Sequence, residues 1–242
     1  MNWKADSLHF VAFGNAPAAV DSLQPWLRVF GGSPQQLQTA PIGQPPYSLA
    51  SGVVGEYQFM ISSNPGRIEL ALSPGAHSNG PPEAIGDWRA ALDVLLGHTT
   101  LASENMGAHR VAIVANFSQQ AQSPFEAAEM FRQSVSLQSL PDNAVDLSFG
   151  FNLVKPIAGL QAEMNRLCRW STGIQQFVGM QLVSGGSAPA ISMQVRHVAN
   201  LQVDLNTSIF DLQDSVLRKS VTEQLSSELI SIAEGGYGYL VS

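Results

Sequence analysis

The sequence is poor in cysteine: Cys168 is the only one among 242 residues. A single cysteine can form no internal disulfide and no cysteine-based zinc site, which fits a reducing compartment. Its neighbours predict a half-buried thiol on a helix. A reactive thiolate usually needs a nearby cation or helix N-terminus together with a base, so we expect no nucleophilic role for this thiol.

Charge is also sparse, at 13% of the residues, and its balance is acidic. Nineteen Asp and Glu residues stand against twelve Lys and Arg residues, which gives a formal net charge of -7. The basic residues are scattered instead of gathered in a run that could bind a phosphate backbone. We therefore expect no nucleic-acid partner.

Long hydrophobic runs are absent as well. No stretch approaches the roughly 20 apolar residues that cross a bilayer. The segment Met1–Asp6 has no basic region followed by an apolar run, as a secretory leader would. These features predict a soluble, cytoplasmic protein without a membrane partner.

Motifs for catalysis, cofactors and metals are missing too. The sequence has neither a Gly-x-Ser-x-Gly elbow nor a glycine-rich phosphate loop. Its histidines lack the helical spacing that commonly builds a metal site. They are His9, His77, His98, His109 and His197. The sequence therefore assigns no catalytic residue, no cofactor and no metal, and an enzyme is not favoured.

Apolar residues, by contrast, make up 45% of the chain, enough for one large core or two modest ones. In the first half we expect a loop over residues 31–48, a hairpin turn at Asn64-Pro65-Gly66 and a helix stop at Gly97. The predicted elements are a strand Ser7–Gly14, a helix from Pro17 to about Leu27, strands Gly52–Ser62 and Arg67–Ser73, a helix to about Leu96, and a strand Ala108–Phe117.

The second half repeats much of this order. Ser123 and Glu126 predict a capped helix start, because each side chain can satisfy a backbone N–H of the first turn. The remaining predicted elements are a strand Val145–Val154, a short helix Leu160–Trp170, strands Ile174–Val183 and Ile191–Leu205 joined through Ser184–Ser187, a helix from Asp211 to about Ala233, and a helix stop at Gly235 before an extended tail.

The order strand, helix, hairpin, helix thus recurs, over residues 7 to 98 and again over 144 to 233. It predicts an α+β fold of two ferredoxin-like βαββα halves, with mainly antiparallel sheets and helices packed on one side. We place the halves at 1–120 and 121–242, closely packed and without a long linker. The boundary is expected near residues 118–123.

The last helix is apolar on two sides. A core-facing stripe is predicted for Leu217, Val221, Leu225, Leu229 and Ile232. The opposite side carries Leu212, Val216 and Ile230. Such a helix is either sandwiched within its own chain or presents its second side to a partner subunit, so the latter three residues are candidate interface residues.

One polar cluster is a candidate ligand site. It combines Asn165, Arg166, Arg169 and Trp170 of one segment with Arg196, His197, Asp204 and Asn206 of a later strand. If the two segments pack together, guanidinium groups and an amide could hold a small anionic ligand, a carboxylate or a phosphate, beside an aromatic ring. The alternative is a structural network in which Arg166 or Arg169 pairs with Asp204.

The segments Met164–Trp170 and Leu201–Thr207, followed by a long final helix, resemble a sporadically distributed bacterial family of uncharacterised proteins. The turn Pro65–Arg67 is a further shared feature. The resemblance implies a bacterial or phage-borne cytoplasmic protein, part of a mobile or defence cassette. It carries over no catalytic residue.

Three functions follow from these patterns. The first is a non-enzymatic binding, assembly or regulatory module that associates with itself or with another protein. The second is a small-ligand binder or enzyme that uses Arg166, Arg169 and His197. The third, which only the family resemblance implies, is an inhibitor that captures a phage or toxin protein.

Overall fold

The computed structural model describes residues 2–15, 20–75, 83–104, 106–135, 140–141, 143–181 and 190–241. Within these residues the chain is α+β, and its strands form one antiparallel sheet in the order β2-β3-β4-β5-β1-β6-β9-β8-β7. The strands are β1 Lys4–Gly14, β2 Gln36–Thr39, β3 Ser48–Val54, β4 Tyr57–Asn64, β5 Arg67–Pro74, β6 Ala108–Ala121, β7 Ser148–Pro156, β8 Glu163–Gln181 and β9 Ala190–Thr207.

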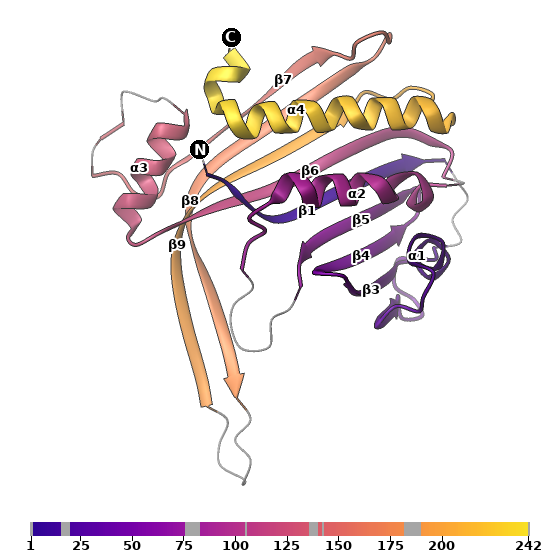
Figure 1. Ribbon diagram of the computed structural model, residues 1–242, viewed down its shortest axis with the longest axis horizontal. Helices are drawn as coiled ribbons and strands as arrows, with labels where there is room; N and C mark the ends of the chain where they lie inside the picture. The colour runs from indigo at the N-terminus through magenta and orange to yellow at the C-terminus, as the bar shows by residue number, and fades with distance from the viewer. Residues whose placement is uncertain are drawn as a thin grey trace.

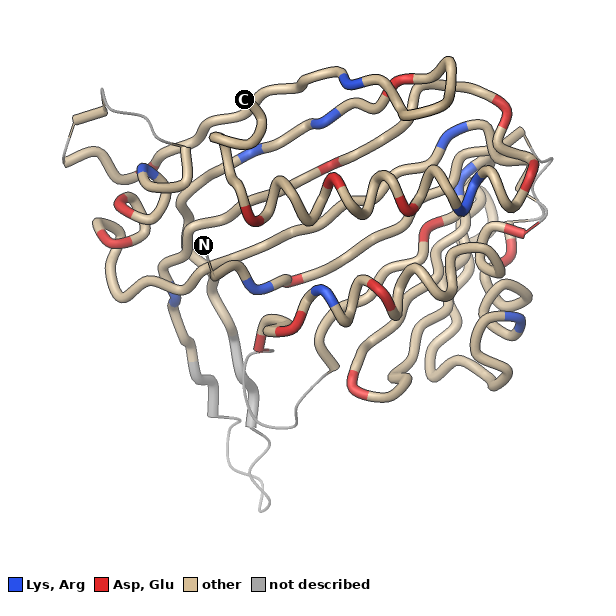
Figure 2. Tube along the Cα trace, turned by 45° about the horizontal axis from the view of Figure 1, so that its top comes forward, with Lys and Arg blue, Asp and Glu red and all other residues tan. Residues whose placement is uncertain are grey.

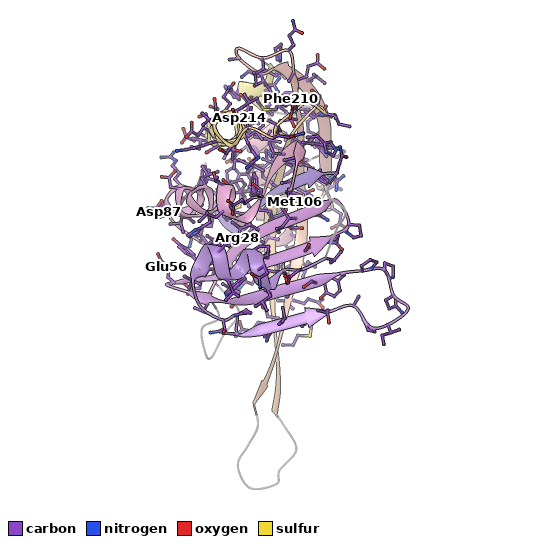
Figure 3. All side chains as sticks on the ribbon, turned by 90° about the vertical axis from the view of Figure 1, so that its right-hand side faces the viewer. Arg28, Glu56, Asp87, Met106, Phe210 and Asp214 are labelled. Carbon is purple, nitrogen blue, oxygen red and sulfur yellow. The ribbon has the colours of Figure 1, made fainter. Side chains whose placement is uncertain are left out.

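The described helices lie against one face of this sheet (Figures 1 and 3). They are α1 Leu23–Phe30, α2 Trp88–Ala102, α3 Pro124–Val135 and α4 Ser215–Val241. We call this side the covered face and the other side the open face. Among the described helices, none has the length and apolar content needed to cross a membrane.

Several predicted elements are confirmed. The hairpin turns at Pro65 and Gly66 between β4 and β5. At the start of α3, Ser123 Oγ accepts from the Glu126 N–H at 3.2 Å, as predicted. Glu126 Oε2 accepts at 2.6 Å from the N–H of Gln122, the residue before Ser123, and not from an N–H of the first turn. In β7, half-buried and exposed residues alternate, as expected of the predicted strand Val145–Val154.

The first half holds more strands than the sequence predicted. The expected strand Gly52–Ser62 is interrupted by a tight turn at Gly55 and Glu56, which separates β3 from β4. Gly55 has a φ of 62°, a backbone conformation that favours glycine. The expected loop over 31–48 contains the edge strand β2, which pairs with β3.

The ferredoxin-like duplication is not confirmed. In the first half two strands that the predicted unit does not contain, β2 and β3, extend the sheet beyond β4. In the second half β7, β8 and β9 form a meander. No helix separates β7 from β8 within the described residues 143–181, so the second half lacks the order on which the repeat depended.

The predicted short helix Leu160–Trp170 was wrong, because most of that segment is strand β8. Met164, Cys168 and Trp170 are buried on the covered face, an alternation that fits a strand. Pairing with β7 on one side and β9 on the other fixes this conformation.

Two predicted helix ends were also wrong. Helix α2 continues past Gly97 to Ala102, since one interior glycine costs a helix only about 1 kcal/mol. After the last long helix the tail is not extended. The chain kinks at Gly236, with φ 59° and ψ -149°, and helical structure resumes as far as Val241.

Some predictions lie outside the described residues. These are the helix start at Pro17 and the connection Ser184–Ser187. The proposed boundary near 118–123 falls at the end of β6, which pairs with β1 of the first half and β9 of the second. One hydrophobic core draws on both halves, from Trp3 and Phe10 to Leu205 and Ile232.

Helix α4 buries its predicted stripe against the sheet, with Val221, Leu225 and Leu229 fully buried. Leu212 is also fully buried, and its N–H donates to the Ala108 carbonyl at 3.0 Å. It cannot serve as an interface residue, contrary to the sequence prediction. Ile230 is half-buried against the core, whereas Val216 is 76% exposed.

Candidate functional site

The residues of the predicted ligand cluster lie on opposite faces of the sheet. Arg166, Trp170 and His197 belong to the covered face, while Asn165, Arg169, Arg196, Asp204 and Asn206 belong to the open face. Successive side chains of a strand point to opposite faces of the sheet. The predicted convergence assumed that the segment Asn165–Trp170 is helical, and a strand cannot produce it. The structure does not bring the whole cluster into one site.

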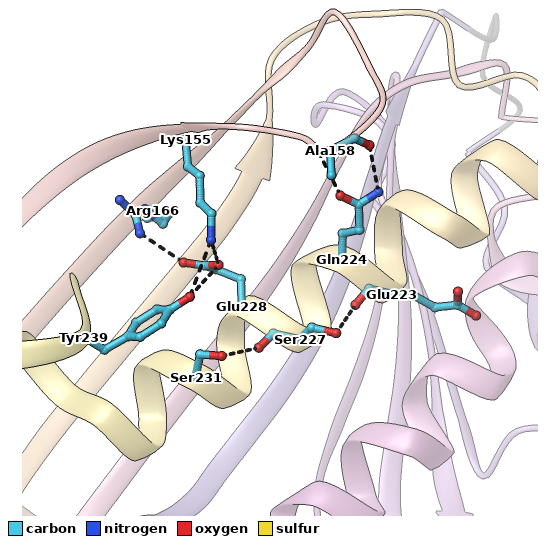
Figure 4. A network of polar contacts seen from close by, with 9 residues as sticks. All are labelled: Lys155, Ala158, Arg166, Glu223, Gln224, Ser227, Glu228, Ser231 and Tyr239. Atoms are coloured by element: carbon cyan, nitrogen blue, oxygen red, sulfur yellow. Dashed lines mark hydrogen bonds and ion pairs between the residues drawn. The ribbon is translucent and has the colours of Figure 1, made fainter. Parts of the chain in front are cut away.

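Arg166 forms a buried ionic network with Glu228 of α4 (Figure 4). Its Nη1 lies 3.0 Å from Glu228 Oε1, and the Lys155 Nζ lies 2.5 Å from Glu228 Oε2. The Tyr239 hydroxyl donates to the same Oε2 at 3.0 Å. This network ties α4 and its final turn to β7 and β8.

The Glu228 side chain is only 5% exposed. Burial raises its pKa, but hydrogen bonds from Lys155, Arg166 and Tyr239 outweigh that effect and leave the pKa below its ordinary value. The sequence held a signal for this residue that we missed. Glu228 follows Leu225 by three positions and precedes Ile232 by four, so it lies on the core-facing stripe of the helix.

Trp170 belongs to the core. Its ring packs beside Phe149 and Phe151, with ring centroids 6.3 and 5.7 Å away. Cys168 is fully buried on β8, not half-buried on a helix as predicted, and burial raises its pKa to about 12. A buried thiol with so high a pKa is not a nucleophile at neutral pH.

On the open face Asp204 pairs with Asn206, whose Nδ2 donates to Asp204 Oδ1 at 3.0 Å. The Asn206 Oδ1 in turn accepts from Arg110 Nη2 at 2.7 Å and from Asn165 Nδ2 at 3.0 Å. The predicted alternative, a pair between Asp204 and Arg166 or Arg169, is therefore not the arrangement seen. A network does form, but around Asn206.

A second polar group on the open face joins Ser7, His9 and Glu69, which sequence analysis did not single out. The Ser7 Oγ lies 2.8 Å from His9 Nε2, and His9 Nδ1 lies 2.6 Å from Glu69 Oε1. The only sequence signal was Ser7 and His9 two positions apart on one predicted strand. Glu69 lies 60 residues later and reaches them because β5 pairs with β1.

An irregularity in β1 directs Asp6 to the open face as well. The pairing of β1 with β6 shifts between Ala5 and Ser7, as at a β-bulge. Asp6 Oδ1 accepts from Ser118 Oγ at 2.8 Å, and burial raises the pKa of the Asp6 carboxyl. A cavity of about 470 Å³ opens beside it, lined also by Lys4, Gln175 and Arg196.

Strands β8 and β9 extend beyond the rest of the sheet (Figure 1). Pairing of β7 with β8 ends at Ser171, and pairing of β6 with β9 ends at His197. We call the remaining two-stranded part, Ile174–Gln181 with Ala190–His197, the ribbon. It projects from the body, and no described helix lies beside it in Figure 1.

The ribbon carries exposed apolar side chains on one side. Ile174 is 58% exposed, Met193 61% and Val195 49%. Their register partners are His197, Val178 and Gln176, which places all three on the continuation of the covered face. The buried surface of the sheet therefore continues onto the ribbon, where no described helix covers it.

The residues described hold no group of three or more His, Cys, Asp or Glu side chains that could bind a metal ion. A scan against models of protein families, a search of curated proteins and a search of solved structures each found no match to this chain.

Proposed function

We propose that this protein is a binding and assembly module that associates with a second copy of itself through the ribbon. The observation that carries the proposal is the exposed apolar stripe of Ile174, Val195 and Met193. Fully burying one such side chain contributes roughly 1.5–3 kcal/mol, so covering the stripe would contribute substantially to association.

The backbone of the ribbon supports the same role. Each of its strands has one edge that pairs with no described strand, because β7 and β6 end at its root. Free edges normally carry charged residues or proline that prevent pairing with other chains. An isolated two-stranded hairpin is also marginally stable in water, which favours a state in which a partner covers it.

The charge pattern favours a second copy as that partner. From Trp170 to Val195 the sequence has no Asp, Glu, Lys or Arg, although the whole chain has a net charge of -7. Charged residues are instead spread over the body (Figure 2). Two ribbons can therefore meet without the like-charge repulsion that other surfaces of this acidic protein would cause.

The test is the molar mass in solution, measured by light scattering after size exclusion over a wide range of protein concentration. We expect a concentration-dependent mass above the 25.9 kDa of one chain. Ile174→Asp and Val195→Asp should each return the protein to a monomer, because either charge would be buried in the association.

Val53→Asp is the matched control, since Val53 is a strand residue 43% exposed and outside the ribbon. Val216→Asp tests the interface predicted for the last helix. Loss of assembly in Val216→Asp but not in the ribbon variants would transfer the interface to α4. A mass of one chain at every concentration would refute self-association.

A second candidate function is the binding of a small anionic ligand. Arg196, a member of the predicted cluster, and Lys4 both line the cavity of about 470 Å³ at the root of the ribbon. Phosphate or a small carboxylic acid should then raise the melting temperature of the wild type but not of Arg196→Ala. No shift across a broad panel of anionic metabolites would remove this candidate.

A further inference from the structure

We propose that Ser7 is a nucleophile, activated by His9 and oriented through Glu69, that accepts the acyl group of a small ester. The three side chains form a continuous hydrogen-bonded chain, with Ser7 Oγ 2.8 Å from His9 Nε2 and His9 Nδ1 2.6 Å from Glu69 Oε1. This is the order of contacts by which a serine, a histidine and a carboxylate perform acyl transfer.

The carboxylate fixes the state of the imidazole. Hydrogen bonding from His9, followed by the charges of His9 and Arg67 and a hydrogen bond from Arg67, holds the pKa of Glu69 below its ordinary value in spite of burial. An ionised Glu69 only accepts hydrogen bonds, so the proton of a neutral imidazole resides on Nδ1. The lone pair of Nε2 then faces the Ser7 hydroxyl, as a general base requires.

Arg67 supports this geometry from the other side of the carboxylate. Its Nη2 lies 2.6 Å from Glu69 Oε2, while His9 uses Oε1. Both oxygens are therefore held, and the Glu69 side chain is only 13% exposed. A carboxylate held in this way keeps the imidazole ring in one orientation.

Asn116 supplies a donor beside the reacting oxygen. Its Nδ2 lies 2.9 Å from Ser7 Oγ, and its Oδ1 accepts from Gln202 Nε2 at 3.0 Å. The bond to Gln202 assigns the amide orientation and leaves the N–H₂ group toward Ser7. In this position it can stabilise the negative charge that develops on a carbonyl oxygen attacked by Ser7.

The setting of Ser7 points to a small substrate. Ser7 and His9 are half-buried on the open face, while the described helices all lie on the covered face. The irregularity at Asp6 lies directly before Ser7, and such bulges often re-aim a side chain at a functional site. A flat sheet surface encloses little of a ligand, so an ester with a short acyl chain fits better than a large one.

The reaction balances without a cofactor. The Ser7 Oγ attacks the ester carbonyl as its proton passes to His9 Nε2, and an Oγ–C bond forms. The ester C–O bond then breaks, and the alcohol leaves with the proton from His9. A water molecule attacks the acyl group on Ser7, giving its proton to His9, and the carboxylic acid leaves as Ser7 regains its proton.

The test uses a fluorophosphonate, which forms a P–O bond with an activated serine and releases hydrogen fluoride. Intact mass should show one equivalent added to the wild-type protein, and peptide mapping should place it on Ser7. Ser7→Ala and His9→Gln should lose the label. Glu69→Gln should slow labelling by about 10²-fold or more, because the imidazole loses its orienting partner.

Ser62→Ala is the matched control. Ser62 is half-buried on the neighbouring strand β4, where its register partner is Glu69. This variant should label at the wild-type rate, and far-UV circular dichroism should show that every variant is folded. Absence of label on the folded wild-type protein, or label that persists in Ser7→Ala, would overturn the proposal.

Discussion

Strands β8 and β9 each run through two regions, the body of the sheet and the ribbon. Their side chains alternate in the same way in both regions, but the neighbouring elements differ. In the body of the sheet, the covered-face residues Trp170 and Leu201 are fully buried. On the ribbon, Ile174 and Val195 continue the same face and are about half exposed. Alternation decides which side chains share a face, but only neighbouring elements decide whether that face is buried.

The largest difference between the two regions should appear in stability. Trp170→Ala should lower the free energy of unfolding by about 3–5 kcal/mol, because it leaves a cavity in the packed core. Val195→Ala should change it by less than about 0.5 kcal/mol in the monomer. Urea unfolding at a concentration where the protein is monomeric measures both. Equal losses would show that the ribbon is packed as tightly as the body.

The next largest effect concerns the ionic network around Glu228, which links α4 to the covered face of the sheet. Glu228→Gln removes the carboxylate that both Lys155 and Arg166 contact, and should cost about 2 kcal/mol of unfolding free energy. Glu223→Gln is the control, since Glu223 is exposed on the same helix and its Oε1 lies 3.9 Å from Lys219 Nζ. It should cost less than about 0.5 kcal/mol. A similar cost for both variants would contradict a structural role for the network.

The stability of the folded protein should also depend on pH through the ionisation of this network. Because the pKa of Glu228 is lower in the folded protein, its contribution is complete above the unfolded value near 4.5 and is lost as the pH falls through the folded value. The pKa of Lys155 is raised, so its contribution is complete below the unfolded value near 10.5 and is lost as the pH rises through the folded value.

The urea midpoint measured between pH 7 and pH 3 checks the acid side of this prediction. It should fall less steeply in Glu228→Gln than in the wild type. Glu69 contributes with the same sign, since its pKa is also lowered. A residual slope should therefore remain in Glu228→Gln and diminish further when Glu69→Gln is added. Parallel curves for wild type and variants would contradict this assignment.

The smallest expected effect is on the reaction of cysteine side chains with a thiol reagent, which reports how exposed each region is. Cys168 should not react with a thiol reagent at pH 8 in the native protein, because it is fully buried and burial raises its pKa to about 12. In a Cys168→Ala background, Ile174→Cys should react rapidly in the monomer and slowly in the assembled protein. Rapid native-state reaction of Cys168 would show that the covered region opens readily.

Much of the local structure was predictable from the sequence. The capping of α3, the turn at Pro65 and Gly66, the alternation of β7 and the core stripe of α4 are examples. Each depends on residues that lie close together in the sequence. Such short-range patterns determine the preferred backbone conformation of a segment and which of its side chains share a face. The segment Leu160–Trp170 shows the limit, since strand pairing overrode the helix predicted there.

The candidate site was less predictable because it joins distant segments. Ser7 and His9 meet Glu69 only through the pairing of β1 with β5, and Arg166 meets Glu228 only through the packing of α4 on β8. The sequence by itself determined which residues alternate, turn and cap. Only the tertiary structure decided that one sheet forms, that Leu212 is buried and that Ile174 is not, because burial and contact depend on elements far away in the chain.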